Sequence, residues 1–293
     1  MSEVMSPAQP ATGAVHTHWP KGAPFPVRKP NLAFEEVAPR WFKNNPILTR
    51  HMDTLSSLFP DGERFFVEAV RAYQKDVKDP ALAREIRAFI GQEARHSEQH
   101  THYNAGAGDV VEWSRKRCER LVKWGRKRLS KRLQLAATVC AEHFTATLGE
   151  HLLRREDIHQ TFADPNMQRM WLWHAVEENE HKTTAFAVFK EQGYSEWLRI
   201  LAMPPTTLAL LYLIVPAHVE MVRRDGHMRD WRSWMQGLQT MLGPNGFYTR
   251  AIADYLDWYR PGFKPEDHDT QALLAQWKRE LGFDQTDGVG GLH

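Results

Sequence analysis

Two segments of the chain carry a glutamate and a histidine three residues apart. The first pair is Glu93 with His96, and the second is Glu178 with His181. Three residues is close to one turn of an α-helix, so the carboxylate and imidazole of each pair project from one helix face. Apolar residues share these faces, and a buried carboxylate needs a cation or a hydrogen-bonding partner. The two pairs therefore predict metal ligands inside a helical core.

Two further glutamates precede these pairs at similar distances. Glu63 lies 30 residues before Glu93, and Glu142 lies 36 residues before Glu178. A carboxylate-bridged two-metal site takes one glutamate from each of two helices and a Glu-x-x-His motif from each of two others. The chain has these parts in the order Glu, Glu-x-x-His, Glu, Glu-x-x-His, which predicts a dinuclear metal site.

Some of these assignments have competitors. Glu63 is also suited to the first turn of a helix, where it would interact with the helix dipole, and Glu68 is its rival, which we interpret as solvated. Glu177 lies four residues before His181 and competes with Glu178. A hydrogen-bonded polar core without metal is the alternative to the whole site, and the repetition of the pattern favours the metal.

Two more histidines fall on the same helix faces. His174 lies four residues before Glu178 and adds a third imidazole, whereas His100, four residues after His96, is either a further ligand or a group behind the ligands. Imidazoles together with carboxylates favour iron or manganese over calcium or magnesium. The predicted ligands are Glu63, Glu93, His96, Glu142, His174, Glu178 and His181.

Local signals place these residues on four long helices. The candidate N-caps are Asp61, Asp79, Ser130 and Asp164. Proline follows two of these caps at the first helical position, as is common in helices. The predicted helices start at 61 and span about 79–103, 130–155 and 164–193. No segment shows the sustained alternation of a strand, so we expect an all-α four-helix bundle.

The ligand order over residues 61–193 resembles that of the ferritin-like di-iron carboxylate proteins. The segment from His174 to His181 is similar to the aminoarene N-oxygenases, in which the additional histidine binds iron. Residues 60–66, 91–96 and 178–182 resemble a bacterial family described as predicted metal-dependent hydrolases. These resemblances imply a ferritin-like bundle with additional C-terminal helices and a pair of iron ions, with manganese accepted by the same ligands.

Three functions fit such a site. The first is a non-haem di-iron oxygenase or oxidase that uses dioxygen on a small, apolar substrate and takes electrons from a reductase or another external donor. The second is a binuclear metal-dependent hydrolase, in which two metals activate water. The third, metal storage or ferroxidase activity, is disfavoured by the extra histidine and the long C-terminal part.

Composition excludes several other classes of protein. The chain has 293 residues, a net charge of +2 and two cysteines. It therefore gives no reason to expect nucleic-acid binding, a disulfide framework or a four-cysteine zinc site. An apolar export segment is missing from the first thirty residues, which predicts a cytoplasmic protein. The oligomeric state is open, with a homodimer as one candidate.

The segments outside the four helices complete the predicted organisation. We expect a flexible arm at 1–30, the bundle at 31–200, a C-terminal helical extension packed on it at 201–282 and a flexible tail at 283–293. Ten of the 18 residues at 115–132 are Lys or Arg, which we interpret as a solvated connection, with contact with anionic lipid or with an acidic part of a substrate as the alternative. Residues 200–217 carry no charge but include three prolines, so we favour a helix packed on the bundle over peripheral contact with a membrane.

Overall fold

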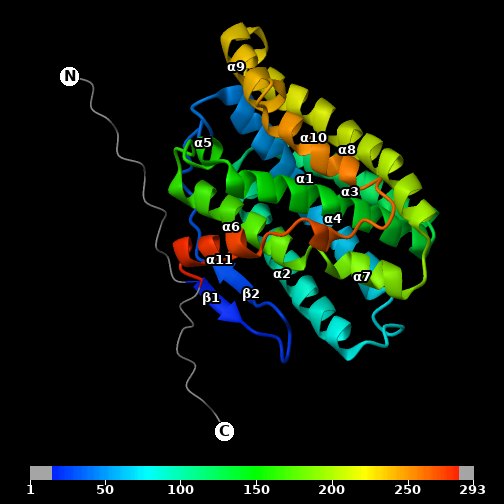
Figure 1. Ribbon diagram of the computed structural model, residues 1–293. Helices are drawn as coiled ribbons and strands as arrows, with labels where there is room; N and C mark the ends of the chain where they lie inside the picture. The colour runs from blue at the N-terminus through cyan, green and yellow to red at the C-terminus, as the bar shows by residue number, and fades with distance from the viewer. Residues whose placement is uncertain (1–14, 284–293) are drawn as a thin grey trace.

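The protein is mainly α-helical, as predicted, and the computed structural model describes residues 15–283 (Figure 1). A small sheet and short 3-10 turns complete the described part. The strands are β1 (Val15–His18) and β2 (Val27–Pro30). The helices are α1 (Pro46–Arg71), α2 (Pro80–Gly106), α3 (Asp109–Arg128), α4 (Lys131–Arg154), α5 (Glu156–His159), α6 (Pro165–His181), α7 (Thr184–Glu191), α8 (Glu196–Arg224), α9 (Trp231–Leu242), α10 (Phe247–Asp257) and α11 (Gln271–Glu280).

Helices α1, α2, α4 and α6 form the central bundle, in which α1 packs along α2 and α4 along α6. Three of them begin where the sequence predicts. The side chains of Asp79, Ser130 and Asp164 accept hydrogen bonds from backbone N–H groups in the first turns of α2, α4 and α6. These contacts satisfy donors that a helix start leaves free. Two apolar clusters fill the bundle on either side of the middle turns that carry the predicted ligands.

The start of α1 differs from the prediction. Asn45, and not Asp61, is the N-cap, and its side chain accepts hydrogen bonds from Ile47 N and Leu48 N. Asp61 lies inside the helix, where it is buried and forms an ion pair with Arg115 of α3. A tertiary ion pair thus holds a residue that by itself is typical of a helix start.

Pro60 also lies within α1, and α2 compensates for it. Proline has no N–H to donate to the carbonyl four residues earlier, which belongs to Ser56. Asn104 of α2 donates to that Ser56 carbonyl through Nδ2 at 2.9 Å. Because the neighbouring helix supplies the missing hydrogen bond, α1 continues through the proline and carries Glu63 in its interior.

The fourth predicted helix is interrupted. It ends as α6 at His181, and α7 begins at Thr184 after a short turn. The hydroxyl groups of Thr183 and Thr184 both donate to Glu85 Oε1 of α2, at 3.2 and 2.7 Å. These contacts with a residue about a hundred positions away fix the turn, and no glycine or proline marks it in the sequence.

The basic segment at 115–132 lies mostly in helix α3 rather than in a solvated connection. One side of α3 is buried, since Cys118 packs in a small apolar cluster with Leu58 of α1 and Leu213 of α8. The opposite side carries exposed lysines and arginines. The segment is therefore an amphipathic helix, which its many lysines and arginines make difficult to recognise from the sequence.

Residues 15–30 form a hairpin of β1 and β2, whereas the sequence predicts a flexible arm there. Arg28 of β2 is buried and donates to Glu177 at 3.0 Å and to Glu180 at 2.7 and 2.9 Å. These ion pairs fix the hairpin to α6, and it lies beside α11 (Figure 1). The rest of the predicted arm, and the predicted tail beyond residue 283, lie outside the described residues.

Helix α8 contains the uncharged segment at 200–217, and the predicted boundary after residue 200 falls inside it. It packs on α1, α3 and α4. Pro216 leaves the Tyr212 carbonyl without its helical donor, and Arg117 of α3 donates to this carbonyl at 3.1 Å. In the described part of the chain, α8 alone is long and apolar enough to cross a membrane, and 17% of its most apolar window is buried.

Arg28→Leu is expected to destabilise the protein, because it removes the cation that neutralises the buried Glu177 carboxylate. Breaking such a buried pair costs about 3–5 kcal/mol. Lys29→Leu on the same strand is the control, since its ion pair is partly exposed and such pairs contribute about 0–1 kcal/mol. Urea unfolding measures both variants. Equal losses of stability would contradict an anchoring role for Arg28.

Candidate metal centre

All seven predicted ligands converge in the middle of the bundle. They project from α1, α2, α4 and α6, and each is at most 4% exposed. Apolar residues above and below them separate this polar layer from solvent. The members of the layer are Glu63, Glu93, His96, Glu142, His174, Glu178 and His181.

One group of ligand atoms surrounds one oxygen of Glu178. His174 Nε2 lies 2.8 Å from Glu178 Oε1 and 3.5 Å from Glu63 Oε1. His96 Nδ1 lies 3.5 Å from the same Glu178 oxygen. One atom from each of these four residues lies within 4.8 Å of the others. This spacing suits atoms that each lie about 2 Å from a common cation.

A second group surrounds the other oxygen of Glu178. His181 Nε2 lies 3.1 Å from Glu93 Oε1, 3.5 Å from Glu142 Oε2 and 3.7 Å from Glu178 Oε2. Glu93, Glu178 and His181 again offer atoms within 4.8 Å of one another. Glu178 therefore belongs to both groups, with one oxygen facing each. Glu178 would therefore be able to hold a cation in each group.

Many of the atoms that line this layer have no hydrogen-bond partner. Leaving a buried polar atom unpaired costs about 1–3 kcal/mol, and more when the group is charged. Four carboxylates also bring up to four negative charges together, which two divalent cations would balance. The residues therefore fit a pair of metal ions. The unpaired atoms include Glu63 Oε1, Glu93 Oε2, both oxygens of Glu142, Glu178 Oε2 and His96 Nδ1.

The pKa values reflect the same excess of negative charge. Burial, followed by the neighbouring Glu93 carboxylate, raises the pKa of Glu63 and of Glu142 well above the ordinary range. Burial opposes a charge on His96, but its contacts with glutamates raise its pKa to about 10. A cation placed among these groups relieves the repulsion between the carboxylates.

Hydrogen bonds on the outer sides of the His181 and His96 rings determine which ring nitrogen carries the proton in the neutral form. His181 Nδ1 lies 2.9 Å from Gln92 Oε1, and His96 Nε2 lies 3.1 Å from Glu177 Oε2. Amide and ionised carboxylate oxygens only accept hydrogen bonds, so these outer nitrogens carry the protons. In the neutral ring the inner nitrogen would hold the lone pair, so a cation that binds there would displace the second proton.

His100 lies behind His174. Its Nε2 is 2.8 Å from His174 Nδ1, and its Nδ1 is 2.8 Å from Ser56 Oγ. Because Ser56 Oγ donates to Asn104 Oδ1, it accepts from His100, and His100 Nε2 accepts from His174. In this tautomer, His174 Nε2 would hold the lone pair that binds a cation beside Glu178. Of the roles that the sequence leaves open for His100, the geometry favours hydrogen-bonding support.

Polar residues to which the sequence assigns no supporting role surround the histidines. Glu177, a rival ligand in the sequence, is turned outward to His96 and held by Arg28. Glu180 binds Arg28, accepts from Gln92 at 2.8 Å and pairs with Lys278 at 2.6 Å. The positions of Glu177, Glu180 and Gln92 next to predicted ligands are a weak signal, whereas nothing local points to Arg28 or Lys278.

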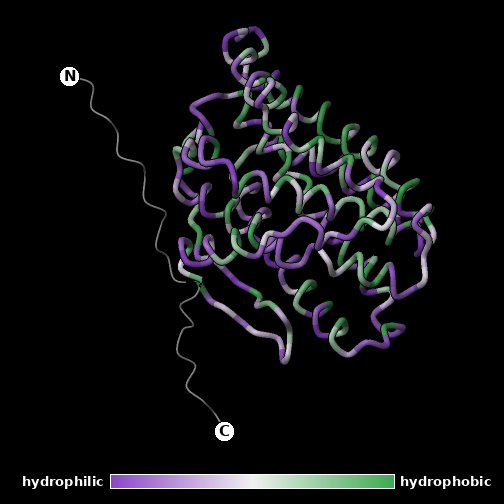
Figure 2. Tube along the Cα trace, viewed as in Figure 1, coloured by the Kyte–Doolittle hydropathy of each residue, from purple (hydrophilic) through white to green (hydrophobic). Residues whose placement is uncertain are grey.

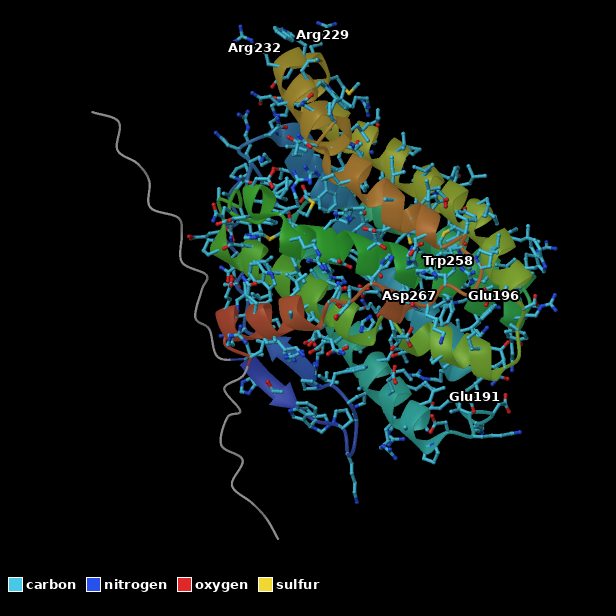
Figure 3. The ribbon with its side chains drawn as sticks, in the orientation of Figure 1. Glu191, Glu196, Arg229, Arg232, Trp258 and Asp267 are labelled. Atoms are coloured by element: carbon cyan, nitrogen blue, oxygen red, sulfur yellow. The ribbon has the colours of Figure 1, made fainter. Side chains whose placement is uncertain are left out.

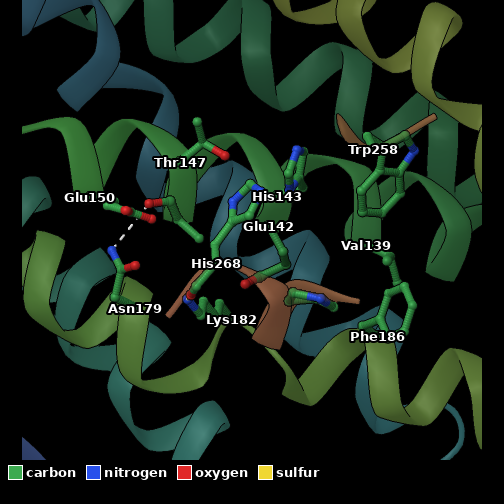
Figure 4. Close-up of a pocket in the computed structure, with 12 residues that line it drawn as sticks. Val139, Glu142, His143, Thr147, Glu150, Asn179, Lys182, Phe186, Trp258 and His268 are labelled. Atoms are coloured by element: carbon green, nitrogen blue, oxygen red, sulfur yellow. Dashed lines mark hydrogen bonds between the residues drawn. The ribbon is translucent and has the colours of Figure 1, made fainter. Parts of the chain in front are cut away.

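A small pocket adjoins the centre on the side of α4 (Figure 4). Glu142 contributes to its wall, and its free volume of about 10 Å³ is close to that of one water molecule. Asn179 Nδ2 donates to the Ala146 carbonyl at 3.1 Å, whereas Asn179 Oδ1 is buried without a partner. The other polar residues of the wall are His143, Thr147, Glu150, Lys182 and His268.

Glu63→Gln is expected to lower the bound metal from two ions per chain toward one, because a neutral amide replaces a carboxylate of the first group. Glu68→Gln is the matched control on α1, since Glu68 is partly exposed and pairs with Arg126. Elemental analysis after anaerobic loading with Fe(II), Mn(II) or Zn(II) measures the metal. Equal metal content in both variants would contradict the assignment of Glu63.

A family model described as "Predicted metal-dependent hydrolase" matches residues 26–269. No curated protein and no solved structure matches the chain at a significant level. The matched span contains all seven candidate ligands and Arg28. Because it covers most of the sequence, the chain belongs to the family of predicted metal-dependent hydrolases.

Proposed function

We propose that this protein is a dinuclear metal-dependent hydrolase that acts on a small molecule. The observation that carries the proposal is the sharing of Glu178, which has one oxygen in each ligand group. Two divalent cations bound in this way lower the pKa of bound water and orient the bond to be broken. The family description supports the same class of reaction.

The residues of the chain have distinct parts in this proposal. One ion would be held by Glu63, His96 and His174, the other by Glu93, Glu142 and His181, and both by Glu178. Gln92 and Glu177 keep the protons of His181 and His96 on the outer nitrogens. The centre is thus prepared for metal before substrate arrives, which limits reorganisation during the reaction.

The pocket beside Glu142 supports a polar substrate. Asn179 is fixed by the carbonyls of Ala146 and Ala175, to which its Nδ2 donates. Its unpaired Oδ1 is then available to accept a hydrogen bond from a substrate O–H or N–H group. Since the free volume suits about one water, the pocket must widen before a larger substrate enters.

A second candidate is oxidation of a substrate by dioxygen at two iron ions. It is favoured by the donor set of four carboxylates and three imidazoles, which suits iron or manganese. The rings of Phe59 and Trp173 lie 4.5 and 4.9 Å from those of His174 and His96, which shields the first group from water. This candidate also requires an external electron donor, such as a reductase.

Turnover of a panel of esters, amides and phosphate esters by the metal-loaded protein tests the hydrolase proposal. We expect the protein to hydrolyse at least one of these substrate classes in the absence of dioxygen. Glu178→Gln should lower the rate by about 100-fold or more, because a neutral amide with a single oxygen cannot serve both ligand groups. Glu68→Gln should retain the activity of the unaltered protein, since Glu68 lies outside the centre.

Oxygen dependence separates the alternatives. Turnover that requires Fe(II), a reductant and dioxygen would contradict the hydrolase proposal and support the oxidative candidate. Binding and oxidation of iron without any substrate turnover would contradict both and point to metal storage or ferroxidase activity.

A further inference from the structure

Helix α8 is apolar on two opposite sides. One side is buried against the bundle through Met203, Ala217 and Met221, which are fully inaccessible. The other side forms a stripe with the spacing of a single helix face, and Figure 2 shows hydrophobic residues along this outer helix. The stripe consists of Leu201, Leu208, Leu211, Tyr212 and Val215, which are 50–67% exposed.

Within residues 15–283, each of these residues keeps at least half of its surface exposed, and Tyr212 at the edge contacts Arg117 of α3. Soluble monomers seldom leave a continuous apolar face of this kind uncovered, and such faces mark interaction sites. Exposed aromatic residues accompany it, with Trp197 at the start of α8 and Trp231 at the start of α9, 71% and 67% exposed. Trp and Tyr side chains are favoured where apolar and aqueous phases meet.

Helix α3 lies beside α8, and both pack on α1. Leu58 of α1, Cys118 of α3 and Leu213 of α8 form one apolar cluster. At the outer edge, the Arg117 guanidinium lies 4.9 Å from the centre of the Tyr212 ring. The exposed faces of α3 and α8 therefore adjoin on the outside of the bundle.

The exposed face of α3 is strongly basic. Ten of the residues at 115–132 are Lys or Arg, against a single acidic residue, Glu119. The basic residues Lys116, Arg120, Lys123 and Lys127 are exposed and follow one another at intervals of four, three and four. This spacing places their charges along one helix face.

Basic residues also occur at the C-terminal end of α8 and just after it. Arg223 and Arg224 end the helix, and both are exposed although they pair with Glu220. Arg229 and Arg232 project outward at the end of the molecule where α9 begins (Figure 3). An apolar stripe is thus flanked by positive charge.

We propose that the α8 stripe and the basic face of α3 bind the surface of an anionic lipid membrane. The stripe inserts between the headgroups while the lysines and arginines bind lipid phosphates, as amphipathic helices do at interfaces. The buried side of α8 stays on the bundle, where Arg199 donates to the Trp258 carbonyl. The helix therefore lies on the membrane and does not span it.

Charge favours a membrane over a second copy of the chain. A two-fold dimer through the same face would bring identical surfaces together, including the two basic α3 faces. Repulsion between these faces would oppose such a dimer, whereas anionic headgroups attract them. This surface is separate from the metal centre, so the proposal does not rest on the proposed reaction.

Sedimentation of the full-length protein with vesicles tests the proposal. We expect binding to vesicles of phosphatidylcholine with 30% phosphatidylglycerol (chosen as the anionic probe) and weaker binding to phosphatidylcholine alone. Binding should also fall as salt concentration rises, because salt screens the attraction of the basic residues to the headgroups.

Two double variants separate the apolar and electrostatic contributions. Leu208→Glu with Leu211→Glu should weaken binding to both kinds of vesicle by roughly tenfold or more, because these side chains would no longer insert. Lys116→Glu with Lys123→Glu should weaken binding only to the anionic vesicles, by roughly tenfold. The replaced side chains are all exposed, and circular dichroism with metal content checks that each variant folds.

Trp19→Glu is the control, because Trp19 is an exposed aromatic residue in the loop between β1 and β2. It should bind vesicles as the unaltered protein does. Failure of the unaltered protein to bind either vesicle, or unchanged binding by the Leu208/Leu211 variant, would overturn the proposal. A dimer in solution that this variant disrupts, without any vesicle binding, would assign the face to self-association instead.

Discussion

Four carboxylates buried within a few ångströms of one another are the constraint on which the rest of this structure depends. Their mutual repulsion and their unpaired oxygen atoms disfavour a bundle in which all four are ionised, unless cations or protons neutralise them. Two divalent cations would balance the charge of four ionised carboxylates. The sharing of Glu178 between two ligand groups connects the two candidate cation sites.

The surroundings of the centre follow from the same requirement. Glu177 and Glu180, which support the histidines from outside, are themselves buried carboxylates, and Arg28 and Lys278 neutralise them. Neutralisation from the hairpin and from α11 leaves the inner carboxylates as the unbalanced charge. The N-terminal hairpin therefore contributes to the electrostatics of the bundle although it provides none of the candidate ligands.

On the outside of the molecule, α8 exposes apolar side chains beside the basic face of α3. The interior concentrates negative charge, while α3 and the ends of α8 and α9 present positive charge. A chain with a net charge of only +2 thus separates its charges strongly in space. This separation allows metal binding inside and the proposed attachment to anionic lipid outside.

Local sequence determined the helical fold, three of the four helix starts and the seven inward-facing ligand candidates, because caps and the 3.6-residue period act within one or two turns. Tertiary structure decided what depends on distant partners. Asn104 allows α1 to continue through Pro60, Glu85 fixes the turn after His181, and Arg28 orders a segment that is rich in proline. Tertiary structure also decided that His100 lies behind His174 and that Glu177 turns outward. Helical spacing alone allows each of these residues to be a ligand, and only contacts with the opposing helices show which ones face the centre.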